Sequence, residues 1–212
     1  MVAAQSVPVD TAQPPPQRRL LLLRHGQTEW SKTGQHTGST DLALTATGRA
    51  QATALTTVLR RLHLADPIVL ASPRRRAVHT AELAGLTITE TTELLGEWDY
   101  GAYEGLTTTQ IRRTVPDWLV WTHGCPDGES VAEVRARADR AVALARAQPA
   151  HRDVVFVGHS HFSRAVITRW LGLPVADGTH FAMPPASVAV AGFEHGLPQL
   201  AALGLTGGRD DD

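Results

Sequence analysis

Cysteine is almost absent from this chain. The 212 residues include one cysteine, Cys125, so no disulfide can form within the chain. A chain without internal disulfides fits a reducing compartment, and we therefore expect a cytoplasmic protein. Cys125 precedes Pro126-Asp127-Gly128, a turn sequence, which favours an ordinary loop cysteine over a nucleophile.

Long apolar runs and a strong net charge are also missing. No stretch approaches the ~20 consecutive apolar residues of a membrane span, so we expect no membrane partner. The formal net charge is −1 and no long basic run occurs, which argues against nucleic acid as a partner. The charge balance does not argue against a small anionic ligand, because such a ligand needs only a local cluster of positive charge.

What is present suits one globular α/β domain, since 42% of the residues are hydrophobic and the length matches a single domain. We expect a disordered N-terminal tail over residues 1–18, which lacks the basic start of a signal peptide. The folded domain is expected over 19–205, followed by a flexible tail over 206–212. Alternating strand and helix patterns predict an α/β fold. We expect a three-layer α/β/α sandwich with a mostly parallel central sheet, helices on both faces and a small helical cap.

The individual elements follow from apolar periodicity and capping residues. Strands are predicted at 19–23, 67–71, 87–89, 153–157, 187–193 and 199–203, and helices at 45–62, 72–84, 108–114, 117–122, 130–149 and 162–171. Thr45 and Ser72 are expected N-caps, the latter with Pro73 at the first helical position, and Ser130 to Glu133 forms a capping box. The helix after Thr45 is expected to bury Ala50, Ala54, Leu55, Val58, Leu59 and Leu62.

Apolar strands end on cationic or imidazole side chains in three places. The run Leu20 to Leu23 leads into Arg24-His25-Gly26, Val154 to Val157 leads into Gly158-His159-Ser160, and the strand ending at Ala71 leads into Ser72-Pro73-Arg74-Arg75-Arg76. Ligands of open α/β sheets bind outside the carboxyl ends of strands, and arginine holds phosphate bidentately. The helix start at Ser160 adds N–H groups that favour an anion. The pattern predicts a phosphate site containing histidine, with Gly26 letting the backbone pass close to the ligand.

Metal binding is the competing chemistry at this edge, because several histidines gathered there could ligate zinc. No His-x-x-x-His pair occurs on a predicted helix, and the neighbouring arginines would repel a cation. We therefore expect no metal.

The same motifs, in the same order, resemble the histidine phosphatase superfamily, also called the phosphoglycerate mutase-like family. The resemblance spans Arg19 to about Phe193. Its motifs are Arg24-His25-Gly26-Gln27-Thr28, Leu44 to Ala52, Ser72 to Ala77, Leu95-Gly96-Glu97 and Gly158-His159-Ser160. Within the family the chain is most similar to a mycobacterial type of acid phosphatase, some of which carry phosphoglycerate mutase names.

The resemblance implies a role for each matching residue. His25 would attack phosphorus and become a phosphohistidine. Arg24, Arg76 and His159, the last as an imidazolium, would hold the phosphoryl oxygens. Glu97 would protonate the leaving oxygen and then act as base for water; the residues alone do not distinguish it from Glu93 or Glu104. Substrate contacts are expected from Gln27, Ser31, Thr37, Gly38, Tyr100 and Ser160, with Ser31 standing where many relatives have Asn.

The implied activity is hydrolysis of small phosphomonoesters, such as sugar or glycolytic phosphates, without metal or cofactor. Its pH optimum should lean towards acid, because Glu97 must carry a proton. A 2,3-bisphosphoglycerate-dependent phosphoglycerate mutase is the alternative, and a catalytically silent binding module is a third reading. Relatives often form dimers through a sheet edge, so a homodimer is one alternative for the oligomeric state. Four aromatic residues either shape the pocket mouth or pack the helical cap: Trp98, Tyr103, Trp118 and Trp121.

Overall fold

The computed structural model describes residues 18–207, and within them six strands form one mixed sheet in the order β3-β2-β4-β1-β5-β6. The parallel strands are β1 (Leu20–Arg24), β2 (Ile68–Ala71), β3 (Glu90–Thr91) and β4 (Val154–Gly158). An antiparallel hairpin of β5 (Ser187–Glu194) and β6 (Leu197–Thr206) continues the sheet beyond β1. The predicted, mostly parallel central sheet is therefore confirmed.

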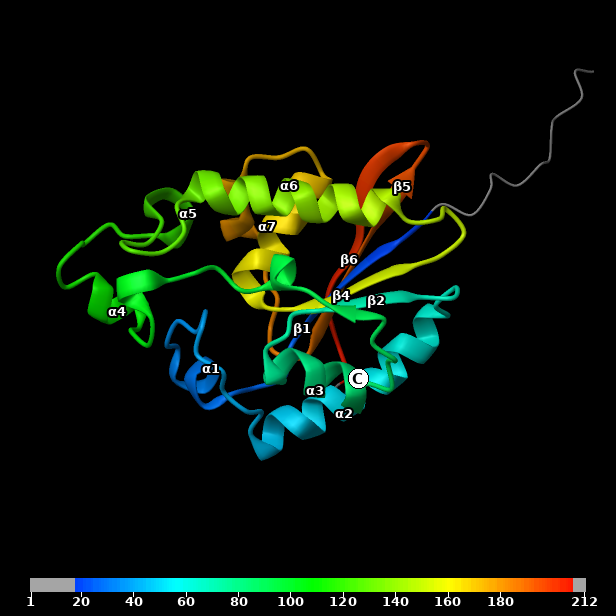
Figure 1. Ribbon diagram of the computed structural model, residues 1–212, viewed down its shortest axis with the longest axis horizontal. Helices are drawn as coiled ribbons and strands as arrows, with labels where there is room; N and C mark the ends of the chain where they lie inside the picture. Colours follow the sequence, from blue (N-terminus) through cyan, green and yellow to red (C-terminus); the bar gives the residue numbers. More distant parts are fainter. Residues whose placement is uncertain (1–17, 208–212) are drawn as a thin grey trace, which may run out of the picture.

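Helices cover both faces of the sheet, which makes the predicted three-layer sandwich (Figure 1). One face carries α2 (Ala46–Leu62) and α3 (Arg75–Leu83), and the other carries α6 (Val131–Ala147) and α7 (Ser160–Trp170). Alternate residues of β1 divide between the two layers: Leu20 and Leu22 pack with α6 and α7, whereas Leu21 and Leu23 pack with α2 and α3. A strand buried on both faces needs a continuous apolar sequence, which explains the run of four leucines.

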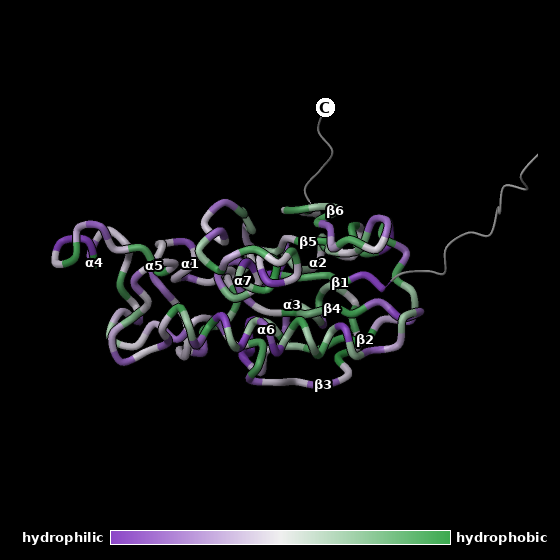
Figure 2. The backbone as a smooth tube through the Cα atoms, turned by 90° about the horizontal axis from the view of Figure 1, so that it is seen from above, coloured by the Kyte–Doolittle hydropathy of each residue, from purple (hydrophilic) through white to green (hydrophobic). Residues whose placement is uncertain are grey.

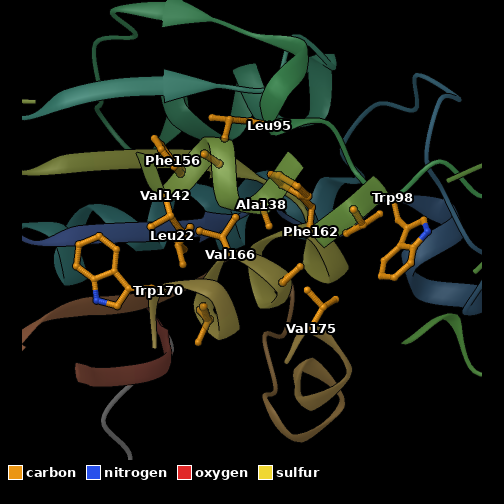
Figure 3. Close-up of a cluster of buried hydrophobic side chains, with 14 of the residues drawn as sticks. Leu22, Leu95, Trp98, Ala138, Val142, Phe156, Phe162, Val166, Trp170 and Val175 are labelled. Atoms are coloured by element: carbon orange, nitrogen blue, oxygen red, sulfur yellow. The ribbon is translucent and has the colours of Figure 1, made fainter. Parts of the chain in front are cut away.

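The larger core lies between the sheet and the α6–α7 layer. Figure 3 shows Leu22 and Phe156 of the sheet facing Val142 of α6 and Val166 and Trp170 of α7. Hydrophobic residues follow the central strands, while polar residues gather around the distant α4 (Figure 2). This apolar packing fixes the carboxyl ends of β1 and β4 relative to each other, and those ends carry the predicted site.

A small cap lies beyond those strand ends and contains α1 (Glu29–Thr33), α4 (Thr108–Ile111) and α5 (Val120–His123) (Figure 1). The described part of the chain also contains three 3₁₀ turns: η1 (Glu93–Leu95), η2 (Gly101–Tyr103) and η3 (Val175–His180). Trp98, Trp118 and Trp121 are buried, and the rings of Trp98 and Trp121 meet edge to face at 5.6 Å. The tryptophans therefore pack the cap rather than shape a pocket mouth.

Several predicted boundaries were wrong for identifiable reasons. Helix α3 begins at Arg75 instead of Ser72, because the Arg75 N–H donates to the Asp41 carboxylate and the Ser72 hydroxyl turns to His159. The third strand forms at Glu90–Thr91, where its backbone pairs with Leu70 and Ala71, instead of at 87–89. Helix α7 begins at Ser160, two residues earlier than predicted. Ala50 is exposed, since the buried face of α2 runs through Ala52 and Leu55.

The predicted tails fall mostly outside the described residues. Arg18, placed in the N-terminal tail, donates hydrogen bonds to the carbonyls of Arg146 and Gln148, and Thr206 belongs to β6. Among residues 18–207, no helix combines the length and hydropathy required to cross a membrane.

Candidate active site

A cavity of about 260 Å³ opens where β1 and β4 end. The two strands pair in parallel with Arg24 opposite Gly158, so the residues after each strand reach the same edge, as predicted. Arg24 and His25 line the cavity from β1, and Ser160 lines it from the start of α7. Glu97 and Tyr100 close it from the loop that precedes α4.

His25 is buried, and one hydrogen bond fixes its tautomer. Its Nδ1 lies 2.7 Å from the Gly26 carbonyl oxygen, which can only accept, so Nδ1 carries the proton. Burial first, and the nearby charges of Arg76 and Arg24 second, hold the pKa of His25 well below its usual range. The ring is therefore neutral, and its Nε2 keeps a free lone pair. This is the form that a nucleophilic histidine needs.

Gly26 allows a close approach of two backbones, and the partner is α2 instead of a ligand. A Cβ on Gly26 would lie 2.3 Å from the Gly48 carbonyl oxygen, and one on Gly48 would lie 2.1 Å from the Gln27 carbonyl oxygen. The Gly26 N–H donates to Thr80 Oγ1 of α3 at 3.1 Å. The loop after β1 is thus held by both helices on that face, which positions the His25 ring.

His159 lies beside His25, with ring centroids 5.3 Å apart. Arg76 Nε can only donate, so His159 Nδ1 accepts from it at 3.2 Å, and Nε2 carries the proton toward Ser72 Oγ at 2.9 Å. Burial, followed by the charge of Arg76, holds the pKa of His159 well below its usual range. The structure thus favours a neutral His159 where the resemblance implied an imidazolium, because burial first and the neighbouring Arg76 guanidinium second oppose a positive charge on the ring.

Arg76 is fully buried, as the sequence motif predicted among the three consecutive arginines. Its Nη1 donates to the Thr40 carbonyl at 2.8 Å, and its Nη2 donates to the Gly38 and Thr37 carbonyls at 3.0 and 3.2 Å. Glu104 accepts the N–H groups of Gly38 and Thr40 on the same segment. Residues 37–40 therefore form a strap across Arg76, which separates its guanidinium from the cavity.

Of the arginines that the sequence assigned to the site, Arg24 is the one that lines the cavity. Its Nη1 donates to the Met183 carbonyl at 2.6 Å, and within residues 18–207 its buried Nε has no hydrogen-bond partner. Burial lowers the pKa of Arg24, whereas the charge of Glu97 raises it. A guanidinium with an unused donor beside His25 is suited to an anion.

Glu97 takes the place that the sequence assigned to a phosphate. Its carboxylate accepts the N–H groups of Ser160, His161 and Phe162 at 2.8–3.0 Å, so it caps the N-terminus of α7. Arg137 of α6 supports the same loop by donating to the Glu97 and Gly96 carbonyls. The prediction that this helix N-terminus holds the ligand is therefore wrong here, since a side chain of the chain already supplies the anion.

The predicted substrate-contact residues divide into two groups. The cavity is lined by Ser31, Thr37, Tyr100 and Ser160. Gln27 instead turns to α2, where its Oε1 accepts from Thr45 Oγ1 at 2.9 Å, and Gly38 belongs to the strap. Ser31 is committed to the capping box of α1, because its Oγ accepts from the Thr28 N–H at 2.8 Å.

Sequence reasoning missed five residues of the cavity wall, which are Gly34, Gln35, His36, His161 and Arg164. Tyr100 Oη lies 2.6 Å from His161 Nδ1, and the rings of His36 and Tyr100 lie 4.7 Å apart in a tilted arrangement. His161 and Arg164 are three positions apart on α7 and so share a face with Ser160, a spacing that could have revealed them. His36 sits in a loop and left no comparable signal.

Comparison with known proteins gives the family. The model of the histidine phosphatase superfamily (branch 1) matches residues 20–206. An acid phosphatase of Mycobacterium tuberculosis is 66% identical over 189 residues, covering 89% of this chain and 93% of the relative. The sedoheptulose 1,7-bisphosphatase of Saccharomyces cerevisiae is 34% identical over 188 residues, covering 74% of this chain and 69% of the relative.

A solved structure of an open reading frame product of Mycobacterium tuberculosis superimposes with a TM-score of 0.89 at 65% identity, covering 90% of this chain and 99% of that one. The family model, the relatives and the fold agree with the resemblance seen in the motifs. The chain is a phosphatase that belongs to the histidine phosphatase superfamily, branch 1.

Proposed function

We propose that the protein hydrolyses small phosphomonoesters without a metal, through a phosphohistidine on His25. The observation that carries this proposal is the state of His25: a buried, neutral imidazole, tied at Nδ1, whose Nε2 is free beside Arg24 in a cavity. Phosphoryl transfer depends mainly on positioning and on stabilisation of charge, and this arrangement supports both.

The proposed reaction has two displacements. His25 Nε2 attacks phosphorus, forming the N–P bond as the bond to the leaving oxygen breaks, and Glu97 gives that oxygen a proton. A water molecule then attacks the phosphohistidine while Glu97 takes a proton from it, releasing inorganic phosphate and neutral His25. Arg24 and His159 would hold the phosphoryl oxygens together with Arg76. To do so, Arg76 must release the carbonyl groups of the strap and donate to the phosphoryl oxygens instead.

Glu97 enters this scheme from its place on α7. The N–H groups of Ser160, His161 and Phe162 fix the carboxylate at the cavity wall, so it is already oriented toward a bound ester. Glu97 thus lines the cavity that would hold the leaving oxygen, where the proposed reaction needs a proton donor.

The substrate class is a small phosphorylated metabolite. A cavity of about 260 Å³ suits a ligand near the lower end of the size range of small-molecule sites. The relatives named acid phosphatase and sedoheptulose 1,7-bisphosphatase both act on phosphate esters by name, which supports sugar or glycolytic phosphates as the substrates to try first.

An acid-leaning pH optimum is part of the proposal. His25 must be unprotonated, and its lowered pKa keeps it so well below pH 6.5, whereas Glu97 needs a proton in the complex. We expect the acid limb of kcat/KM to lie below pH 6.5 and kcat to fall as the solution becomes alkaline. A profile of both constants from pH 4 to 9 measures this, and a kcat that rises steadily into alkali would contradict it.

Trapping the intermediate tests the central step. Brief reaction with a ³²P-labelled phosphomonoester, followed by denaturation, should give wild-type protein carrying an acid-labile, base-stable label. His25→Ala should take up no label and lose about 10⁴-fold or more in kcat, as nucleophile removal does in other enzymes. His79→Ala, on α3, is the matched control and should keep both. An unlabelled wild type, or full activity in His25→Ala, would contradict the proposal.

The same labelled protein separates hydrolysis from mutase activity. With 3-phosphoglycerate and 2,3-bisphosphoglycerate present, a phosphatase releases the label as inorganic phosphate. Recovery of most of the label in bisphosphoglycerate and 2-phosphoglycerate would favour the mutase instead.

A further inference from the structure

Glu104 has no part in the proposed reaction, yet its carboxylate bonds to the strap of residues 37–40. Its two oxygen atoms accept the Gly38 N–H at 2.8 and 3.0 Å, and Oε1 also accepts the Thr40 N–H at 3.0 Å. Hydrogen bonds from N–H groups to a carboxylate are charge-assisted and stronger than those between neutral groups. Glu104 therefore holds the strap by its N–H groups, while Arg76 holds it by its carbonyls.

One peptide group of the strap lies directly between these two charged side chains. The Thr37 carbonyl accepts from Arg76 Nη2 at 3.2 Å, and the Gly38 N–H of the same peptide group donates to Glu104. A trans peptide group is planar, so its C=O and its N–H point in opposite directions and rotate together. Rotation of this carbonyl away from Arg76 would therefore also break the bond to Glu104.

The chain is fixed on both sides of the strap, which confines movement to the strap itself. Before it, the His36 carbonyl accepts the Gly105 N–H at 2.9 Å. After it, the Asp41 carboxylate accepts the Arg75 N–H at the start of α3, also at 2.9 Å. Residues 37–40 can thus rotate without displacing the cap or α3.

The strap also has open space on two sides. Thr37 lines the cavity that contains His25, whereas Gly38 and Ser39 line a second cavity of about 300 Å³. Arg74 lines this second cavity as well. The strap is therefore a partition between two cavities, and it can turn into the second without disturbing a packed core.

We propose that Glu104 is a positioning residue that acts as a latch: it holds the strap closed over Arg76 until a phosphoryl group displaces the strap. This inference rests on the proposed function, because it assumes that Arg76 binds the phosphoryl oxygens once the strap has opened. The latch lowers the affinity for phosphate in proportion to the fraction of molecules whose strap is open. A charged phosphoryl group can displace neutral carbonyls from Arg76, whereas an uncharged group cannot.

Weakening the latch should tighten phosphate binding. Glu104→Gln removes the charge and one of the two acceptor oxygens. In Gly38→Ala, the new Cβ would lie 2.6 Å from the Trp98 carbonyl oxygen and 3.0 Å from Glu104 Oε2, which pushes the strap away from Glu104. Calorimetric titration with inorganic phosphate should give a Kd about 3- to 10-fold lower in both variants than in the wild type. Glu82→Gln, which removes an exposed carboxylate from α3, is the control and should bind phosphate as the wild type does.

Steady-state kinetics separates a latch from a merely structural role. The KM for glycerol 3-phosphate should fall in both variants, whereas kcat should stay within about threefold of the wild-type value, because bound substrate already holds the strap open. A residue that only stabilised the fold would lower kcat or raise KM when replaced. Values of Kd and KM that are unchanged or higher in both variants would overturn the proposal.

Hydrogen exchange tests the wild-type protein, so it does not depend on the folding of any variant. Saturating inorganic phosphate should speed exchange of the Gly38 and Thr40 amide hydrogens at least about tenfold, because opening releases both from Glu104. The Ile111 amide, which donates to the Thr107 carbonyl in α4, is the reference and should not change. Unchanged or slower exchange at Gly38 and Thr40 would also overturn the proposal.

Failure of the latch and failure of the proposed function give different results. A phosphohistidine on His25, together with unchanged phosphate binding in Glu104→Gln and Gly38→Ala, would overturn this inference alone. Tighter phosphate binding in both variants without a phosphohistidine in the wild type would overturn the proposed function alone.

Discussion

At the scale of single residues, hydrogen-bond partners set the tautomers of the two central histidines. The Gly26 carbonyl places the His25 proton on Nδ1, whereas Arg76 Nε leaves the His159 proton on Nε2. The rings are neighbours and both are neutral, yet they carry their protons on opposite nitrogen atoms. Ser72 completes the second arrangement, and so this serine serves the site instead of capping a helix.

Removing the Ser72 hydroxyl should therefore affect catalysis as well as stability. Ser72→Ala leaves His159 Nε2 without its buried partner, which should cost about 1–3 kcal/mol of unfolding free energy and lower kcat about 10-fold. Urea denaturation and steady-state kinetics measure the two effects. Ser187→Ala is the control, because the buried Ser187 hydroxyl has no partner within residues 18–207, and it should be neutral or stabilising. An unchanged kcat in Ser72→Ala would show that the hydroxyl does not position His159.

At the scale of elements, two helix starts organise the site by opposite means. The N-terminus of α7 accepts the Glu97 carboxylate, which anchors the loop carrying the proposed acid. The first turn of α2 instead offers a bare backbone at Gly48, against which the loop after β1 packs at Gly26. The contact of Glu97 with α7 is electrostatic, and the contact of Gly26 with Gly48 is steric. The first positions the loop that carries Glu97, and the second positions the loop that carries His25.

The steric contact predicts a large effect from one methyl group. In Gly48→Ala the new Cβ would meet the Gln27 carbonyl oxygen at 2.1 Å, so the loop must move and His25 with it. We expect a loss of about 1–3 kcal/mol in unfolding free energy, despite the better helix propensity of alanine, and at least a tenfold lower kcat. Gly192→Ala, which meets nothing within 4 Å, should change unfolding free energy by less than about 0.5 kcal/mol. Equal stability of the two variants would refute the steric account.

At the scale of the whole molecule, the buried histidines link folding to pH. Burial is the largest cause of the lowered pKa of His25, His159 and His161, so these rings stay neutral in the folded protein. In the unfolded chain they take up protons near their usual pKa of about 6.5. The contribution of these histidines to the free energy of unfolding is therefore fully present above pH 6.5, and it is lost as the pH falls below that value.

Urea denaturation between pH 7.5 and 5.0 should show this loss, at up to about 1.4 kcal/mol per pH unit for each buried histidine. This window lies above the range in which ordinary carboxyl groups titrate. His161→Gln removes one such group and should reduce the slope by about one proton. A stability that stays level from pH 6.5 to 5.0 would show that the rings are protonated in the folded state.

The sequence by itself determined the central apolar strands, the helix caps at Thr45 and Ser130, and the position of His25 and His159 directly after strands. These features are local: an apolar run buried on both faces, a cap that bonds three residues ahead, and a polar motif directly after a strand. Parallel pairing of β1 with β4, which belongs to the tertiary structure, then brings the two motifs together.

Only the tertiary structure decided what those residues touch. Arg76 meets carbonyls of the strap, Glu97 occupies the start of α7, and Gly26 approaches α2, through contacts between segments from 22 to 65 residues apart. Arg164 lines the cavity because α7 packs against the cap, where the Arg164 guanidinium lies over the Trp121 ring. Backbone carbonyls and N–H groups are present at every residue, so the sequence cannot mark which of them a side chain will meet; packing of the layers chooses them.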